Sequence, residues 1–441
     1  MTSRSQIRSS RKQYIYLDYA ASTPVSREVF KAMEPYFADR FGNPGSVHSF
    51  GQESQAAIDK AREVITKSIG AKFNEIIFTG SATEANNLAL RGLIKAYQHK
   101  SLPAGGQEPK IGINQRPRII VSSIEHESVL DTARDLEKEG VEVIYLPVDK
   151  EGFISIESLK NNLTENTVLV SIIYASNEIG TVQPIGEISK LILEFRKQKV
   201  ESRSDENSRF YFLDSRFPLL HTDAAQAFQF LDCDVDRLGV DLMTLSAHKI
   251  YGPKGIGALY VATRVQPLAT GTQKFTLSPG DYTLRPIITG GGQEYGLRSG
   301  TENVPAVVGF GKAVEFIQKN KIKEGKRIKV LRDYFWRELK NAKPDIELNG
   351  PPTSSLNRLP NNLNVYIRGR DSRDLLIELD LVNVAVSAGS ACSARNTKPS
   401  HIIAALNLGG NRAKSSLRIS FGLPTARRQL DIALKRIVNL L

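Results

Sequence analysis

The 441-residue chain contains only two cysteines, three methionines and one tryptophan. Cys233 and Cys392 lie too far apart in a cysteine-poor chain to indicate a disulfide framework, and neither belongs to the Cys-x-x-Cys spacing typical of zinc sites. Long apolar runs are missing as well. The longest candidates, such as residues 168–175, are far shorter than the about 20 residues that a membrane helix requires. We therefore expect a soluble protein of a reducing compartment, the cytoplasm, with no metal site and no membrane association.

The chain is basic, with 59 Lys and Arg against 47 Asp and Glu and a net charge of +12. Hydrophobic residues make up 41% and charged residues 24%, which is typical of folded globular proteins and excludes a disordered chain. Apart from residues 1–13 and 319–327, the basic residues are dispersed among acidic ones. Nucleic-acid binding requires clustered positive charge, so no direct nucleic-acid partner is expected. Residues 1–13 are Ser- and Arg-rich like a transit peptide but few for one, and we favour a frayed basic terminus.

From residue 73 onward, short β-branched runs alternate with segments of helical period. This alternation predicts an α/β fold with a large, mostly parallel sheet covered by helices on both faces. After about residue 305, a long helix-period stretch at 307–340 is followed by shorter strands, which indicates a smaller α+β domain. We place the large domain at residues 18–320 and the small domain at residues 1–17 together with 321–441.

The local patterns predict individual elements. The expected strands are 14–17, 76–78, 118–122, 141–148, 168–174, 217–223 and 241–245, and the expected helices are 83–97, 128–139, 156–162 and 185–197. Three further segments have the composition of surface loops: residues 101–117, 200–216 and 265–285. No function is assigned to these insertions.

Polar residues follow several of the expected strands, at the edge of a parallel sheet where ligand-binding loops gather. Lys249 follows strand 241–245 and could supply the desolvated amine that a Schiff base needs, although a plain turn would also account for the string. Asp223 ends another strand and could keep a pyridine nitrogen protonated. Residues 78–87 run from a strand into a helix start, where a phosphate could bind. His126 taken alone is better explained by a structural role than by a functional one.

Ten short motifs occur in order along the chain. They are LDYAASTP (17–24), GNPGSVH (42–48), EHESVL (125–130), SNEIGT (176–181), HTDAAQ (221–226), SAHKIYGPKGIG (246–257), GGQE (291–294), LRSGTEN (297–303), SAGSACS (387–393) and SLRIS (416–420). Together they resemble the class V aminotransferase family of pyridoxal-phosphate enzymes and, within it, the NifS/IscS-type cysteine desulfurases. The resemblance extends from Tyr16 to Gly422 and implies the type I fold of these enzymes.

The resemblance implies roles for particular residues toward a pyridoxal 5′-phosphate cofactor. Lys249 would form the Schiff base and later move a proton, and Asp223 would pair with the pyridinium nitrogen. Gln226 would donate a hydrogen bond to the phenolic oxygen, and His126 would stack on the ring and take part in acid–base steps. The residues expected at the phosphate are Thr83, Ser246 and His248, with Thr301 reaching in from a neighbouring subunit of a homodimer.

The resemblance also implies a substrate site and a nucleophile. Asn177 and Arg418 would bind the amino-acid substrate, since the guanidinium fork suits a carboxylate. Cys392, in a run of small residues, would attack the sulfur of bound L-cysteine, giving L-alanine and a persulfide on Cys392. The six residues between Cys392 and Pro399 resemble the long loops of desulfurases that reach a scaffold protein. Sulfur would then pass to an acceptor or scaffold for iron–sulfur cluster assembly and tRNA thiolation.

Other interpretations stay open at this point. A selenocysteine lyase or a class V small-amino-acid aminotransferase is the alternative enzyme, and a catalytically silent scaffold or nucleic-acid-binding protein is the alternative class. The order Gly80-Ser81 and the loop residues Arg395 and Asn396 depart from the usual family pattern. Cys233 has no motif around it and is interpreted as an inert structural thiol.

Overall fold

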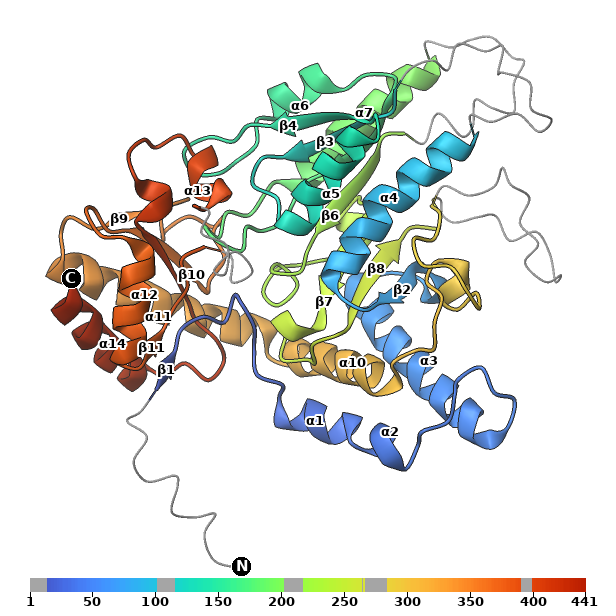
Figure 1. Ribbon diagram of the computed structural model, residues 1–441, viewed down its shortest axis with the longest axis horizontal. Helices are drawn as coiled ribbons and strands as arrows, with labels where there is room; N and C mark the ends of the chain where they lie inside the picture. Colours follow the sequence, from blue (N-terminus) through green and yellow to red (C-terminus); the bar gives the residue numbers. More distant parts are fainter. Residues whose placement is uncertain (1–13, 101–115, 202–216, 264, 266–283, 390–398) are drawn as a thin grey trace, which may run out of the picture.

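A seven-stranded sheet forms the centre of the larger part of the molecule (Figure 1). The computed structural model describes residues 14–100, 116–201, 217–263, 265, 284–389 and 399–441. In spatial order the strands are β2 (Ile76–Thr79), β8 (Gly257–Val261), β7 (Leu242–Ser246), β6 (Leu219–Asp223), β5 (Thr167–Ser171), β3 (Arg118–Ser122) and β4 (Glu142–Leu146). The pairs from β7 to β4 are all parallel, and β8 runs antiparallel to both of its neighbours. The expected mostly parallel sheet is confirmed.

The central strands are buried along their whole length because helices cover the sheet, and polar residues occur mainly toward their carboxyl ends. Every residue of β5, β6, β7 and β8 is buried. Helices α4 and α5 pack against each other and against this sheet, while α7 contacts β6 and α6 contacts β4. The helices of this part are α1 (Arg27–Met33), α2 (Pro35–Ala38), α3 (Ser49–Ile69), α4 (Ala82–Lys100), α5 (Glu127–Lys138), α6 (Ile156–Asn162), α7 (Ile185–Glu201), α9 (Val235–Leu238) and α10 (Val304–Gln318).

The smaller part lies beside the large sheet (Figure 1). It has its own apolar core. Its strands form an antiparallel sheet in the order β12-β10-β9 and a separate parallel pair, β1 with β11. Its elements are β1 (Ile15–Tyr16), α11 (Lys321–Ala342), β9 (Glu347–Leu348), β10 (Asn362–Tyr366), α12 (Ser372–Leu381), β11 (Val384–Ala385), β12 (Ser416–Ser420) and α14 (Arg427–Leu440). Helix α13 (His401–Ala405) follows β11 in the chain, but its buried Ile402 and Ile403 belong to the core of the larger part. Ile15 and Leu17 belong to this second core, although they begin the described chain. The exact domain limits given above stay predictions.

One expected element is wrong in its extent. The helix-period stretch at 307–340 is two helices, α10 and α11, because the backbone leaves the helical conformation at Asn320 (φ −134°, ψ 15°). Helix α10 packs on α3 and α1 of the larger part, whereas α11 packs on α14 and β10 of the smaller part. Each helix therefore buries its own apolar face. The helical spacing of apolar residues continues in the sequence between the two helices, although the helix itself is interrupted there. The strand expected at 14–17 is likewise reduced to Ile15–Tyr16.

The remaining expected strands and helices of the larger part are present: β3 and α6 have the expected bounds, and the others have ends shifted by a few residues. Most of the three insertions lies outside the described residues, so their expected loop structure stays a prediction. Within the described ranges, no helix combines the length and the apolar character needed to cross a membrane.

Candidate active site at the carboxyl edge of the large sheet

Lys249 lies at the end of η2 (Ala247–Lys249), a short 3-10 turn that directly follows β7. Its Nζ donates hydrogen bonds to the carbonyl oxygens of Ala20 (2.7 Å) and Ala21 (2.8 Å). Gln226 follows β6, and its Nε2 donates to the same Ala20 oxygen at 2.8 Å. The structure therefore brings together two residues expected at the cofactor, and it places both against the N-terminal motif 17–24.

Asp223 is the last residue of β6 and is 5% exposed. Its Oδ1 accepts from the backbone N–H of Ala225 (2.9 Å), and its Oδ2 accepts from Nδ2 of Asn86 (2.8 Å). Asn86 is fully buried on α4, and its Nδ2 also donates to Oγ of Ser128 at 2.8 Å. A carboxylate held by defined donors at a strand end can pair with a protonated pyridine nitrogen.

His126 is the N-cap of α5, and its Nδ1 accepts from the backbone N–H of Ser128 at 3.1 Å. The hydroxyl of Ser128 lies 2.9 Å from the same nitrogen. Burial lowers the pKa of His126, with Lys249 acting in the same direction and the Asp223 charge opposing it. The imidazole is therefore neutral near pH 7, which suits stacking on an aromatic ring.

Strands β2 and β7 end on either side of the start of β8, at the edge where a phosphate is expected. Gly257 of β8 pairs with Thr79 of β2 on one side and with Ser246 of β7 on the other. A Cβ on Gly257 would lie 2.6 Å from the backbone carbon of Ser81 and 2.8 Å from the nitrogen of Ala82, so glycine allows the start of α4 to approach the sheet. The N-terminus of α4 therefore lies close to Ser246, at the helix end that favours anions.

The predicted phosphate residues surround this edge. Thr83 is exposed in the first turn of α4, and Ser246 is buried at the end of β7. His248 lies in η2 with its Nδ1 3.4 Å from Oγ of Ser22, and burial, assisted by the Lys249 charge, lowers the pKa of His248 to about 3. The reversed Gly80-Ser81 order places the Ser81 hydroxyl as acceptor for the Glu84 backbone N–H at 3.1 Å. That hydroxyl caps α4.

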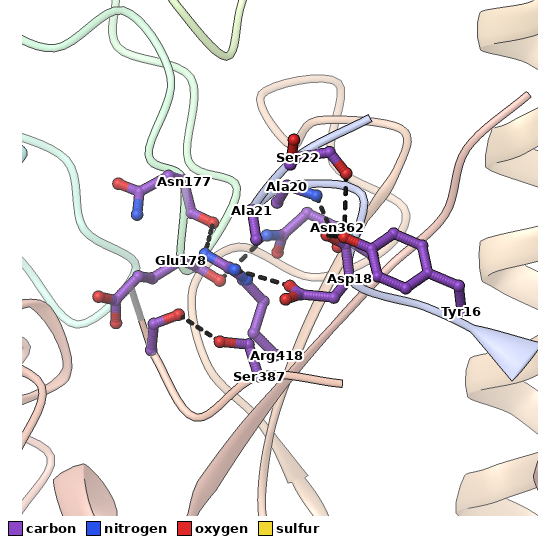
Figure 2. Close-up of polar contacts among 12 residues, drawn as sticks. Tyr16, Asp18, Ala20, Ala21, Ser22, Asn177, Glu178, Asn362, Ser387 and Arg418 are labelled. Atoms are coloured by element: carbon purple, nitrogen blue, oxygen red, sulfur yellow. Dashed lines mark hydrogen bonds and ion pairs between the residues drawn. The ribbon is translucent and has the colours of Figure 1, made fainter. Parts of the chain in front are cut away.

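Arg418 and Asn177 come from different parts of the chain and meet in the interior (Figure 2). Arg418, on β12, donates through Nη1 to the carbonyl oxygen of Asn177 at 3.1 Å, and its Nη2 forms an ion pair with Asp18 at 2.8 Å. Within the described residues, Nε of Arg418 and Oδ1 of Asn177 are buried without a hydrogen-bond partner. These two atoms are a donor and an acceptor left over for a polar ligand.

Residue 392 lies outside the described residues, as do its neighbours from 390 to 398. Gly389 and Ser400, on either side of these residues, lie close to the carboxylate of Glu178, which is 1% exposed. Ser400 donates through Oγ to Oε2 of Glu178 at 2.5 Å, and a Cβ on Gly389 would lie 3.3 Å from that oxygen. The two flanks of the segment therefore reach one buried carboxylate next to Asn177.

Thr301 is exposed between η3 (Glu294–Gly296) and α10. Its expected contact involves a second subunit and stays a prediction. Sequence reasoning missed Asp18, Asn86, Ser128 and Glu178 as members of the site. Asp18 and Glu178 lie in quoted motifs, and Ser128 is two residues from His126, so position within a motif was the available signal.

The residues of this edge fit a pyridoxal phosphate group. The set contains a lysine amine, a buried carboxylate, a neutral imidazole and a helix start beside a serine hydroxyl. These are the donors that an aldehyde, a pyridine nitrogen, an aromatic ring and a phosphate require, respectively. Among the described residues, no group of three or more His, Cys, Asp and Glu side chains is arranged to hold a metal ion.

Comparison with known proteins agrees with this chemistry. Residues 15–200 and 216–432 match the family described as Aminotransferase class-V. A cysteine desulfurase IscS of Dictyoglomus turgidum is 42% identical over 423 residues, which cover 96% of this chain and 93% of that protein. Cysteine desulfurase IscS 1 of Archaeoglobus fulgidus is 38% identical over 416 residues, covering 94% of each chain.

Solved structures give the same result. A NifS-like protein superimposes with a TM-score of 0.78 at 29% identity, over 97% of this chain and 99% of that one. A structure of SspA in complex with cysteine matches with a TM-score of 0.69 at 34% identity, over 92% and 98% of the two chains. The chain therefore belongs to the pyridoxal-phosphate-dependent class-V aminotransferase family and, within it, groups with the IscS-type cysteine desulfurases.

Proposed function

We propose that the protein is an L-cysteine desulfurase that converts L-cysteine to L-alanine and stores the sulfur as a persulfide on Cys392. The observation that carries this proposal is the position of Lys249. Its amine and the side chain of Gln226 both donate hydrogen bonds to the carbonyl oxygen of Ala20. Asp223 and His126 lie at the same edge of the sheet. The cysteine desulfurases among the relatives support the substrate.

Four residues of the sheet edge would hold the reacting part of the cofactor. Bound pyridoxal phosphate supplies a cationic ring that draws electrons from the substrate Cα. Lys249 holds the cofactor aldehyde and, once released by substrate, moves the proton at Cα. Asp223 keeps the ring nitrogen protonated, Gln226 donates to the phenolic oxygen, and His126 covers one face of the ring.

The phosphate group would lie at the start of α4. Thr83 and the first N–H groups of that helix would bind it together with Ser246 and His248, and the support is that Gly257 pairs with Ser246 and allows the start of α4 to approach it. Thr301 would reach the phosphate of the partner subunit, because it is exposed and precedes α10. The proposal therefore includes a homodimer in which each subunit completes the other's site.

Arg418 and Asn177 would bind the substrate carboxylate. Nε of Arg418 has no hydrogen-bond partner among the described residues, and Nη1 of Arg418 donates to Asn177. Both are donors in a buried position, where a charge-assisted hydrogen bond to a carboxylate is strong. Since Arg418 is already paired with Asp18, the substrate carboxylate joins or replaces an existing anion rather than entering an empty cationic pocket.

The sulfur transfer step involves Cys392. Its thiolate attacks the sulfur of the bound cysteine, the Cβ–S bond of the substrate breaks, and the new S–S bond forms on Cys392. The electron pair of the broken bond remains on the substrate carbon, which takes up a proton and becomes the methyl group of alanine. Sulfur is transferred at the persulfide level to an acceptor or an iron–sulfur scaffold protein, and from there to tRNA thiolation.

The proposal places this reaction in the cytoplasm, with neither nucleic acid nor membrane as a direct partner. The scarcity of cysteine and the dispersion of basic residues support it.

The test is to incubate purified protein, loaded with pyridoxal phosphate, with L-cysteine and a reductant. Alanine and sulfide are expected in equal yield, and a parallel incubation without the reductant should leave a persulfide on the peptide containing Cys392. Cys392→Ala should abolish both products. Cys233→Ala is the matched control, because Cys233 is buried and burial raises the pKa of its thiol to about 12. Sulfide production that survives Cys392→Ala would contradict the mechanism, and activity confined to selenocysteine would identify the lyase instead.

A further inference from the structure

The hydrogen bonds around Asp223 determine the direction of a longer series of bonds that ends at His126. An ionised carboxylate only accepts hydrogen bonds, so the amide group of Asn86 that faces Oδ2 of Asp223 at 2.8 Å is its NH2. The same Nδ2 lies 2.8 Å from Oγ of Ser128. The two protons of one amide nitrogen are therefore both used, one toward Asp223 and one toward Ser128.

This arrangement leaves the Ser128 hydroxyl with one direction for its own proton. The oxygen already accepts from Asn86, and Nδ1 of His126 lies 2.9 Å away. The backbone N–H of Ser128 donates to that same nitrogen at 3.1 Å. Nδ1 therefore faces two donors, so in the neutral imidazole the ring proton belongs on Nε2.

We propose that Asn86 and Ser128 are positioning residues that connect Asp223 to His126 through hydrogen bonds and hold the neutral ring of His126 in the Nε2–H form. In this form His126 interacts through Nε2 as a hydrogen-bond donor, and it cannot remove a proton through that nitrogen. The inference refines the role given to His126 and rests on the proposed function for its substrate. It also links the residue that would pair with the cofactor nitrogen to the residue that would stack on its ring.

The surroundings of His126 favour the neutral ring. Burial and the positive charge of Lys249 oppose protonation, and the carboxylate of Asp223 favours it. Protonation at Nδ1 would place an N–H against the Ser128 backbone N–H, so it would require the local bonds to rearrange. The ionisable groups that act on the ring from the packed elements are Asp223 of β6, Lys249 and His248 of η2, His401 of α13 and Glu127 of α5.

The tautomer can be observed directly in the cofactor-loaded protein. The chain has six histidines, so selective ¹⁵N-histidine labelling gives few signals, and His126→Gln identifies the one from residue 126. Two-bond ¹H–¹⁵N correlation spectra distinguish the two neutral forms. We expect an unprotonated, hydrogen-bonded Nδ1 and a protonated Nε2. A wild-type spectrum with the proton on Nδ1 would overturn the proposal whatever the variants do.

The variants separate the hydroxyl from the backbone donor. Ser128→Ala removes one of the two bonds that stabilise neutral His126, so its pKa should rise by roughly half to one unit, or the minor Nδ1–H population should increase. Ser128→Thr restores the hydroxyl and should restore the wild-type spectrum. Ser123→Ala is the matched control, because Oγ of Ser123 is buried on the same turn with no hydrogen-bond partner among the described residues. An unchanged His126 signal in Ser128→Ala would refute the link.

The experiment separates this inference from the proposed function. If cysteine yields no alanine while the Nε2–H form and the Ser128→Ala effect are observed, the proposed substrate is wrong and the hydrogen-bond link stands. If alanine and sulfide form but Nδ1 carries the proton, the reaction stands and the link fails.

Discussion

Arg418 and Asp18 form an ion pair with 2.8 Å between Nη2 and Oδ1, although 400 positions separate them in the chain (Figure 2). The Arg418 side chain is 1% exposed and that of Asp18 is 15% exposed, so the pair lies largely out of water. It joins β12 of the smaller part to the motif that also contacts Lys249. The residue proposed to bind the substrate and the residue proposed to bind the cofactor therefore both contact the segment 17–24.

The geometry of Arg418 predicts a binding defect in Arg418→Lys. Lysine keeps the charge but loses the fork that serves Asn177 and Asp18 together, so KM for cysteine should rise at least about tenfold with a much smaller change in kcat. Steady-state alanine formation measures both constants. Arg370→Lys is the control, because Arg370 is partly exposed and pairs with Glu378 on α12. An equal loss of kcat and kcat/KM would instead assign Arg418 to the transition state.

Lys249→Ala should remove covalent attachment of the cofactor and lower alanine formation by about 10²–10⁴-fold, since the group that moves the Cα proton is lost. Borohydride reduction followed by mass spectrometry of the intact protein detects the attachment. Lys254→Ala, which changes an exposed lysine on the same glycine-rich turn, should retain the cofactor mass. Retention of that mass in Lys249→Ala would show that another amine carries the cofactor.

Gly257→Ala should weaken cofactor binding by about tenfold or more. The new methyl group would lie 2.6–2.8 Å from backbone atoms of Ser81 and Ala82, so the first turn of α4 must move away from Ser246. Equilibrium dialysis with pyridoxal phosphate measures the change. Gly186→Ala is the control, because its Cβ would meet only the Arg237 carbonyl oxygen at 3.9 Å. Unchanged affinity would exclude the start of α4 as the phosphate site.

The buried carboxyl group of Glu125 leads us to expect that the free energy of unfolding depends on pH. Burial raises the pKa of this carboxyl from 4.5 to about 8, so between these values the folded state holds a proton that the unfolded state has released. The stability from neutral Glu125 is fully present below about pH 4.5 and is lost as the pH rises to about 8. Glu125→Gln cannot ionise and keeps an acceptor for Ile173 N–H.

The free energy of unfolding of Glu125→Gln relative to wild type should therefore rise by several kcal/mol from about pH 5 to about pH 8.5, at about 1.4 kcal/mol per unit. Denaturant titrations at several pH values measure it. Burial lowers the pKa of His221 to about 4, which acts in the opposite direction, but both proteins contain His221 and its contribution cancels. Glu157→Gln, at an exposed position on α6, should show no such trend. A flat difference for Glu125→Gln would contradict a neutral carboxyl.

Local patterns predicted the elements that carry the site. Apolar runs are recognisable as strands because β5 to β8 are buried. Asp223, the last residue of β6, and Lys249, just after β7, are found at the expected strand ends. The same reasoning failed at 307–340, because the apolar period does not reveal that α10 and α11 pack on different cores. Element type is thus a local property, whereas the end of a helix depends on its packing partner.

The sequence by itself determined which chemical groups the protein has and at which strand ends they lie, because strand burial and motif order are local in the chain. Only the tertiary structure decided which of them touch. The contact of Asn86 with Asp223 and that of Asp18 with Arg418 join residues 137 and 400 positions apart. Such contacts arise when separate elements pack and buried polar groups must find partners, a condition that no short segment of sequence contains.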